Sequence, residues 1–496
     1  MENFCQTIER LVGLLTYDVS APLLFNSGLF LWLFLLFSLG YALLQNRQTA
    51  RLIFVTAFSY YFYYKSSGTY FFLLAIVSGA DFLIARALHR SVHLAKRRWL
   101  VTASIGLNMG LLAYFKYTNF LGEAFAGLLG GSFQPQDIFL PVGISFFTFQ
   151  SLSYTIDVYR RQITPLRNPL DYFFYVSFFP QLVAGPIVRA RDFIPQIRRP
   201  LVLSRTMMGE AVVLIAAGLL KKAVISDYIS VNFVDRVFDN PLLYSGIENL
   251  AAVYGYALQI YCDFSGYSDM AIGIALLLGF RFPDNFRSPY QSDSVTAFWR
   301  RWHISLSSWL RDYLYISLGG NRKGKLRQYV NLMLTMLLGG LWHGASWNFI
   351  AWGGMHGVAL ALHKWWMQLT HQPRGGSQLK GWRRVGAVLL TFHFVCIAWV
   401  FFRSGTFEVA MNVFHQIFTN IHIDVLPQML AGYATVMSLI AIGFLAHFMP
   451  HAWTRSLQAF VSLQPLAVKA LLLILVAYIV IQVKGSDVQP FIYFQF

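Results

Sequence analysis

Apolar stretches of membrane-spanning length, separated by short polar segments, dominate the pattern of the chain. A transmembrane helix needs about 17–25 mostly apolar residues, and runs near that length recur from end to end. Some runs are short or interrupted, so the pattern predicts an all-α polytopic membrane protein with about 10–13 transmembrane or re-entrant helices. The runs lie at residues 28–45, 52–88, 99–115, 138–156, 171–188, 207–225, 246–279, 328–342, 345–362, 385–402, 426–448 and 466–483.

The segments between these runs carry clustered positive charge, which orients the helices because basic loops prefer the cytoplasmic side. The segment 403–427 has little positive charge and is expected outside. The last run then leads outward from Lys469 and leaves the C-terminal tail outside. The clusters expected in the cytoplasm are His89–Arg98, Arg189–Arg199, Asn321–Arg327 and Lys364–Arg384.

Composition agrees with a bilayer environment. Of the 496 residues, 56% are hydrophobic and 12% are charged, against roughly 45–50% and 25% in soluble domains. The net charge of +17 would suggest nucleic acid in a soluble protein. Here the basic residues lie in short loops, where they orient helices and meet lipid head groups. We therefore expect the lipid bilayer as a partner and no nucleic acid.

Two further classes of feature are not indicated. Cys5, Cys262 and Cys396 lie far apart, without the spacing of a disulfide framework or a metal site. The first apolar run follows a neutral-to-acidic leader without a basic start, so it is interpreted as a retained helix and not as a signal peptide.

The densest polar stretch within apolar surroundings is 298–312, FWRRWHISLSSWLRD, which contains His303. At helical spacing, one apolar face collects Trp302, Leu306, Trp309 and Leu310. This pattern predicts an amphipathic helix at the cytoplasmic membrane interface. The helix could serve chemistry through His303, or it could simply anchor the chain to lipid.

A second histidine, His343, lies in LGGLWHGASW between two apolar runs with basic outer ends, which predicts a hairpin with His343 near its apex. Gly339, Gly340 and Gly344 would let the backbones approach closely. An ionisable residue within the membrane is a functional candidate by default, and the alternative is a histidine buried for packing. Neutral imidazole is suited to accept a hydroxyl proton during acyl transfer.

Asp263 and Asp269 lie in YCDFSGYSDMAIG. Their spacing does not bring them together on one helix as a carboxylate pair. We interpret them as structural hydrogen-bond anchors.

Several long motifs in a fixed order resemble the membrane-bound O-acyltransferase family. They include FWRRWHISLSSWLRDYLYISLGGNR and LLGGLWHGASWNFIAWGGMHG, with LPVGISFFTFQSLSYTIDVYR and DFSGYSDMAIGIALLLGFRFPDNF upstream. The similarity runs from about Ile53 to Phe402. It is greatest to the bacterial members that acetylate alginate, with those that act on peptidoglycan or add D-alanine to teichoic acid as relatives.

The resemblance implies a ring of helices around a thin centre with a tunnel through the membrane. It gives His343 the place of the catalytic histidine and His303 that of the second active-site position. Arg301, Trp302, Trp342 and Asp312 flank these positions and are expected to support the site. The implied donor is cytoplasmic acetyl-CoA or another acyl thioester, with no permanently bound cofactor and no metal. The implied location is the bacterial inner membrane, with a periplasmic serine-hydrolase-like partner and an exported polysaccharide as the final acceptor.

The C-terminal tail ends in FIYFQF, which places Phe491, Tyr493 and Phe496 in the pattern FxYxxF. This resembles a motif of exporting family members, in which the tyrosine carries the acyl group as an ester and the phenylalanines dock the tail. A phenol is a competent nucleophile once its proton is taken. The alternative is an aromatic belt at the membrane interface.

The predicted organisation has four parts: residues 1–52 as leader and first helix, 53–403 as catalytic core, 404–484 as C-terminal helices and 485–496 as external tail. Transfer of D-alanyl or a longer acyl chain is an alternative to acetyl transfer. A transporter without acyl chemistry is another alternative, but the two related halves expected of many transporters are not visible in the sequence.

Overall fold

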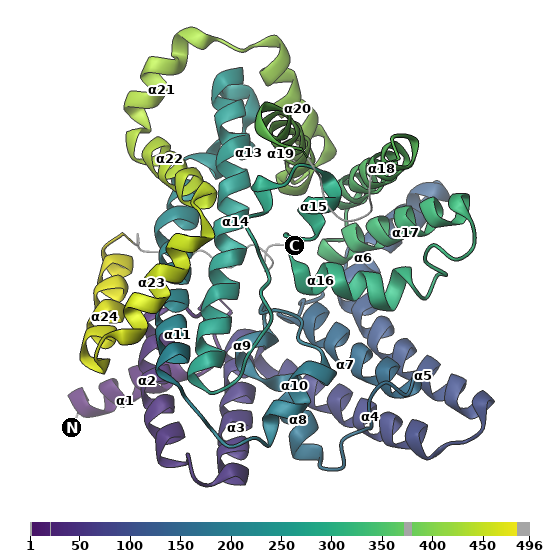
Figure 1. Ribbon diagram of the computed structural model, residues 1–496, viewed down its shortest axis with the longest axis vertical. Coiled ribbons are helices and arrows are strands. Elements are labelled where there is room, and N and C mark those ends of the chain that lie inside the picture. The colour runs from purple at the N-terminus through teal and green to yellow at the C-terminus, as the bar shows by residue number, and fades with distance from the viewer. Residues whose placement is uncertain (1, 20, 372–378, 484–496) are drawn as a thin grey trace. The chain divides into compact units, whose positions relative to one another are not determined.

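The computed structural model describes residues 2–19, 21–371 and 379–483 of the chain. Within these ranges it contains helices and connecting segments and no β-strand (Figure 1). The chain forms two compact units. The first comprises Met1–Met208 with Ala271–Pro283, and the second comprises Gly209–Met270 with Asp284–Phe496. The all-α fold predicted from the apolar runs is therefore confirmed.

The first unit is organised around α4, α5 and α7, which pack on one another. Asp81 of α4 is buried and accepts hydrogen bonds from Ser104 Oγ (2.6 Å) and Asn108 Nδ2 (2.8 Å) of α5. Buried carboxylates require such partners. The helices of this unit are α1 (Glu2–Leu15), α2 (Gly28–Leu43), α3 (Gln48–Ser67), η1 (Gly68–Tyr70), α4 (Phe71–Arg90), α5 (Leu94–Leu112), η2 (Ala113–Tyr117), α6 (Thr118–Leu128), α7 (Ile144–Tyr159), α8 (Pro169–Ser177), α9 (Phe179–Leu182) and α10 (Ala190–Ile197).

Arg97 ties the ends of two of these helices together. Its guanidinium donates to the carbonyl of Leu88 near the end of α4 (2.5 Å) and to that of Tyr159 at the end of α7 (2.5 Å). The last carbonyls of a helix lack partners within the helix and carry the negative end of its dipole. A buried cation at this position satisfies both ends.

The second unit contains the helices that hold the two candidate histidines, His303 and His343. Two helices, α11 (Arg205–Leu219) and α14 (Gly246–Leu277), cross the boundary between the units in sequence. The others are η3 (Leu220–Ser226), α12 (Asp227–Ile229), η4 (Ser230–Val234), α13 (Asp235–Asp239), η5 (Pro241–Leu243), η6 (Pro289–Gln291), α15 (Val295–Trp299), α16 (Ile304–Trp309), η7 (Leu310–Tyr315), α17 (Lys325–His343), α18 (Trp347–Leu369), α19 (Gly381–Arg403), α20 (Phe407–Thr419), η8 (Ile423–Val425), α21 (Leu426–Gly432), α22 (Ala434–Phe448), α23 (His451–Leu463) and α24 (Leu466–Val483).

Ion pairs link η3 to α14 within the second unit. Lys222 is buried, and its Nζ lies 2.5 Å from Asp263 and 2.7 Å from Asp227. Lys221 pairs with Asp269 at 2.6 Å. These contacts agree with the structural interpretation of Asp263 and Asp269, because a charge taken out of water is retained only where it is paired.

The predicted hairpin around His343 is confirmed. Helices α17 and α18 lie side by side (Figure 1), and His343 is the last residue of α17. A Cβ on Gly340 would lie 2.2 Å from the carbonyl oxygen of Phe349, and one on Gly353 would lie 2.4 Å from that of Met336. Two glycines therefore let the helix backbones touch, as small residues do where helices pack in membranes.

Three helical stretches among the described residues are long and apolar enough to cross a membrane: Gln48–Arg90, Gly381–Arg403 and Leu466–Val483. Ile423–Gly432 with Ala434–Phe448 adds a fourth if this pair, bent by 94°, counts as one span.

Several predicted runs are divided or have shifted boundaries. The run 171–188 is not one helix, because it divides into α8 and α9, followed by a segment without regular structure. Phe178, between them, has φ −53° and ψ 110°, outside the helical region. The run 138–156 becomes helical only from Ile144, after Gly143 in a left-handed conformation (φ 74°). The number of crossings and the four-part organisation remain predictions.

The glycine contact predicts a contrast between two substitutions in the hairpin. Gly340→Ala places a methyl group against the Phe349 carbonyl and should destabilise the protein by about 1–3 kcal/mol, as overpacking does. Gly354→Ala meets only Leu337 Cδ2 at 3.6 Å and should be neutral or slightly stabilising, since alanine is the better helix former. Thermal unfolding of both variants in detergent checks this, and equal midpoints would contradict it.

Candidate functional site

His343 lies at the turn between α17 and α18 and is buried, with 3% of its surface exposed. Its imidazole is surrounded by aromatic rings. Trp352 meets it edge-on with centroids 5.1 Å apart and planes at 85°, and Phe402 lies at 5.2 Å. The turn is tight, because a Cβ on Gly344 would fall within 2.0 Å of the Phe349 ring. The hairpin therefore holds the second candidate histidine inside the protein.

The stretch 298–312 does not form the single interfacial helix that its pattern predicts. Helix α15 ends at Trp299, α16 begins at Ile304, and His303 between them has φ +43°. The four residues of the predicted apolar face are nevertheless all buried: Trp302, Leu306, Trp309 and Leu310. His303 is also fully buried, whereas Arg300 and Arg311 of the same stretch are exposed, so one side of the stretch faces the protein interior. The left-handed backbone at a non-glycine residue is a strained conformation of the kind that gathers at functional sites.

Asn285 fixes both the break in the chain and the orientation of the His303 ring. The backbone carbonyl oxygen of Asn285 accepts a hydrogen bond from the N–H of Ile304 (2.9 Å). Its side-chain oxygen, Oδ1, accepts one from the N–H of Ser305 (3.2 Å). These are first-turn donors of α16 that lack a cap from His303 itself. A residue distant in sequence therefore caps α16.

The side-chain oxygen of Asn285, Oδ1, also indicates which tautomer His303 adopts. His303 Nδ1 lies 3.2 Å from Asn285 Oδ1, which already accepts a backbone N–H and is therefore the oxygen. The Asn285 Nδ2 group donates to Ser268 Oγ at 3.1 Å, which agrees with this orientation. Nδ1 must then donate, and the lone pair of the neutral ring lies on Nε2. Nε2 has no hydrogen-bond partner among the described residues.

Trp342 brings the two histidines together. Its ring centroid lies 4.9 Å from that of His343 and 6.1 Å from that of His303, so the two imidazoles are at most about 11 Å apart. Trp342 is itself buried. The motifs RWH and LWHG, separated by 40 residues in sequence, therefore form one cluster in the second unit.

A third buried histidine belongs to the same cluster and was missed by the sequence analysis. His356 of α18 is fully buried and contacts Trp352, whose ring also meets His343. The indole N–H of Trp299 donates to His356 Nδ1 at 3.2 Å. The hydrogen of the neutral ring is then on Nε2, which has no partner among the described residues. The available signal was the histidine in WGGMHG on the second arm of the hairpin.

The predicted supporting residues differ in burial: the tryptophans are buried, whereas Arg301 and Asp312 are only partly buried. Trp302 is fully inside, with its ring 5.0 Å from Trp399. Arg301 is half-buried, and its carbonyl accepts the N–H of Arg287 at 2.9 Å. Asp312 pairs with its neighbour Arg311 at 2.6 Å, and the Arg311 side chain is 64% exposed. Asp312 therefore participates in an ion pair with a largely exposed partner, unlike the buried tryptophans.

The tail residues Phe491, Tyr493 and Phe496 lie outside the residues that the structure describes. In the part that it does describe, no group of three or more His, Cys, Asp or Glu residues is arranged to hold a metal ion. The chemistry that the cluster offers is that of its imidazoles. His303 presents a lone pair, which can accept a proton or a hydrogen bond, and His356 presents an N–H, which can donate a hydrogen bond.

Comparison with known proteins identifies relatives over most of the chain. The profile of the membrane-bound O-acyltransferase family matches residues 85–410. A protein of Pseudomonas putida named "Probable alginate O-acetylase AlgI" is 37% identical over 96% of this chain and 100% of its own length. Its namesake from Pseudomonas aeruginosa is 41% identical over 80% of this chain and 75% of its own. A peptidoglycan O-acetyltransferase of Helicobacter pylori is 39% identical over 79% of each chain.

The hydrogen bonds of Asn285 predict graded effects of two substitutions. Asn285→Ala leaves the buried N–H of Ser305 and the ring of His303 without their acceptor and should cost about 2–3 kcal/mol of stability. Ser268→Ala removes only the acceptor of the Asn285 amide and should cost about 1 kcal/mol. The unfolding midpoints in detergent measure both effects. A larger loss in Ser268→Ala would show that Asn285 does not hold this region.

Proposed function

Since the chain belongs to the membrane-bound O-acyltransferase family, we propose that it passes an acetyl group from a cytoplasmic thioester, acetyl-CoA, across the bacterial inner membrane. The relatives named as acetylases and acetyltransferases are 37–41% identical over most of this chain. Their names refer to alginate and peptidoglycan, so the proposed final acceptor is an exported polysaccharide. The observation that carries the assignment of the site is the burial of His303 and His343 near the same indole ring, that of Trp342.

In the proposed reaction, His343 acts as general base. A hydroxyl oxygen attacks the carbonyl carbon of the thioester while the imidazole takes the hydroxyl proton. The carbon–sulfur bond then breaks, and the thiolate takes the proton from His343 and leaves as free coenzyme A. The Nε2 lone pair of His303, available because Nδ1 faces Asn285, accepts a hydrogen bond from a different N–H or O–H group of the bound substrates and helps to orient them. Surrounding aromatic rings keep water away from the thioester.

The attacking hydroxyl is proposed to be the phenol of Tyr493 in the tail, with Phe491 and Phe496 docking the tail beside the site. Tyr493 would carry the acetyl group as an ester on the periplasmic side. A serine-hydrolase-like partner in the periplasm would then take the acetyl group and transfer it to the polysaccharide. The sparse positive charge of 403–427 and the final run from Lys469 support an external tail.

Removal of the proposed base tests the catalytic assignment. In His343→Ala, O-acetylation of the exported polysaccharide should fall by about 10²–10⁴-fold, the usual contribution of a general base. The exposed His451 offers the matched control, and His451→Ala should retain activity. Acetyl content of the polymer is measured in cells with the chromosomal gene deleted, after confirming equal amounts of each variant in the membrane. Undiminished acetylation in His343→Ala would overturn the assignment.

The tail proposal is tested by removing one oxygen atom. Purified protein incubated with radiolabelled acetyl-CoA should become covalently labelled, and Tyr493→Phe should abolish the label and the polymer acetylation together. Tyr478→Phe, at an exposed position of α24, removes a phenol from the same region and should keep the label. Normal activity in Tyr493→Phe would rule out the ester. If D-alanyl or long-chain thioesters label the protein and acetyl-CoA does not, the donor is a different thioester. If no thioester labels the protein, the result favours a solute transporter without acyl chemistry.

A further inference from the structure

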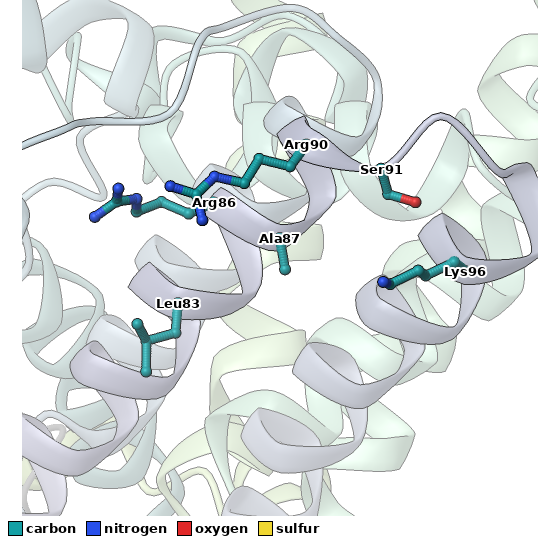
Figure 2. Close-up of a pocket in the computed structure, with 6 residues that line it drawn as sticks. All are labelled: Leu83, Arg86, Ala87, Arg90, Ser91 and Lys96. Carbon is teal, nitrogen blue, oxygen red and sulfur yellow. The ribbon is translucent and has the colours of Figure 1, made fainter.

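A basic cavity of about 370 Å³ lies in the first unit, where α4 ends and α5 begins. Its lining consists of Leu83, Arg86, Ala87, Arg90, Ser91 and Lys96. Figure 2 shows Lys96 reaching from α5 toward α4, from which the two arginines project. This cavity lies outside the candidate acyl-transfer site, whose residues belong to the second unit.

The three cations of the cavity are not neutralised by the protein. The sequence has no Asp or Glu between Asp81 and Glu123, and Asp81 is buried against Ser104 and Asn108. Within the described ranges, Arg86, Arg90 and Lys96 form no ion pair. The neighbouring Arg97 differs, because helix-end carbonyls bind its guanidinium. The cavity therefore offers uncompensated positive charge to an anion.

The loop between the two helices adds Ser91 to the lining of the cavity. Ser91 Oγ is shielded from solvent and has no hydrogen-bond partner among the described residues. Guanidinium and ammonium groups, which the cavity presents, are typical ligands of phosphate oxygens.

The surface of α4 leading to the cavity is apolar and exposed. Phe72, Ile76 and Leu83 have 58%, 66% and 65% of their surface exposed, and their spacing places them on one face of the helix. Arg86 and Arg90 continue that face at its C-terminal end. An exposed apolar stripe on a membrane protein faces lipid tails, and this one ends at the cationic cavity.

We propose that this cavity binds the phosphate of an anionic glycerophospholipid whose acyl chains lie along the Phe72–Leu83 stripe. The charge of the cavity selects the head group, and the stripe accounts for the tails. The exposed Trp99, one turn beyond Lys96 on α5, fits the head-group level where tryptophan is enriched. A soluble phosphate compound such as coenzyme A shares the head-group chemistry but would make no use of the stripe. The lipid is therefore the occupant that uses both features.

Native mass spectrometry of the full chain in detergent tests the site. Phosphatidylglycerol should bind the unaltered protein, and phosphatidylethanolamine should bind more weakly. In Arg86→Gln/Arg90→Gln/Lys96→Gln the dissociation constant for phosphatidylglycerol should rise about fivefold for each cation removed, the effect of one basic residue near an anionic lipid surface. Arg322→Gln/Lys323→Gln/Lys325→Gln removes three exposed charges elsewhere and is the matched control, expected to bind as the unaltered protein does.

Equal phosphatidylglycerol binding by the cavity variant and the control would overturn the proposal, as would equal binding of the two lipids. Coenzyme A or inorganic phosphate is added in a separate arm. If either displaces phosphatidylglycerol at equal concentration, the lipid tails contribute nothing and the proposed occupant is wrong. Unfolding midpoints without lipid check that the triple variant is folded. If it is not, Arg90→Gln, at an exposed position, decides by the same measurement.

Discussion

The backbone contact between α17 and α18 at Gly340 and Gly353 is the constraint from which the candidate site follows. A side chain at either position would separate the helices, because Cβ atoms there would overlap carbonyl oxygens of the facing helix. Trp342 and His343 follow Gly340 within one turn, so close approach of the backbones carries both rings into the protein interior. Trp352 and His356 on the other arm are buried by the same packing.

The position of His303 depends on hydrogen bonds to Asn285 and not on helix packing. Asn285 caps α16 from a distance in sequence and holds the His303 ring through Nδ1. Trp342 joins the two histidines, since it contacts both His303 and His343. One histidine is thus positioned by helix packing and the other by hydrogen bonding, and an indole ring couples the two.

Several buried charged groups elsewhere in the molecule are paired. Lys222 has two carboxylates, Asp81 has two donors and Arg97 has helix-end carbonyls. In each case a buried polar group has the partners that compensate its loss of water. The Nε2 atoms of His303 and His356 have none among the described residues. These two ring nitrogens are therefore available to a substrate that enters the cluster.

Sequence alone determined the features that depend on residue type and spacing. Hydrophobic runs determined the helical membrane class, because a bilayer admits only segments with internally satisfied backbones. Two apolar runs with basic outer ends predicted the hairpin around His343, and helical spacing predicted the burial of Trp302, Leu306, Trp309 and Leu310. Only the tertiary structure decided where that pattern breaks, because the αL turn at His303 depends on hydrogen bonds that Asn285, eighteen residues upstream, accepts from the N–H groups of Ile304 and Ser305. It also decided the His303 tautomer and the place of His356, since helical periodicity reports which face is apolar but not which distant side chain meets it.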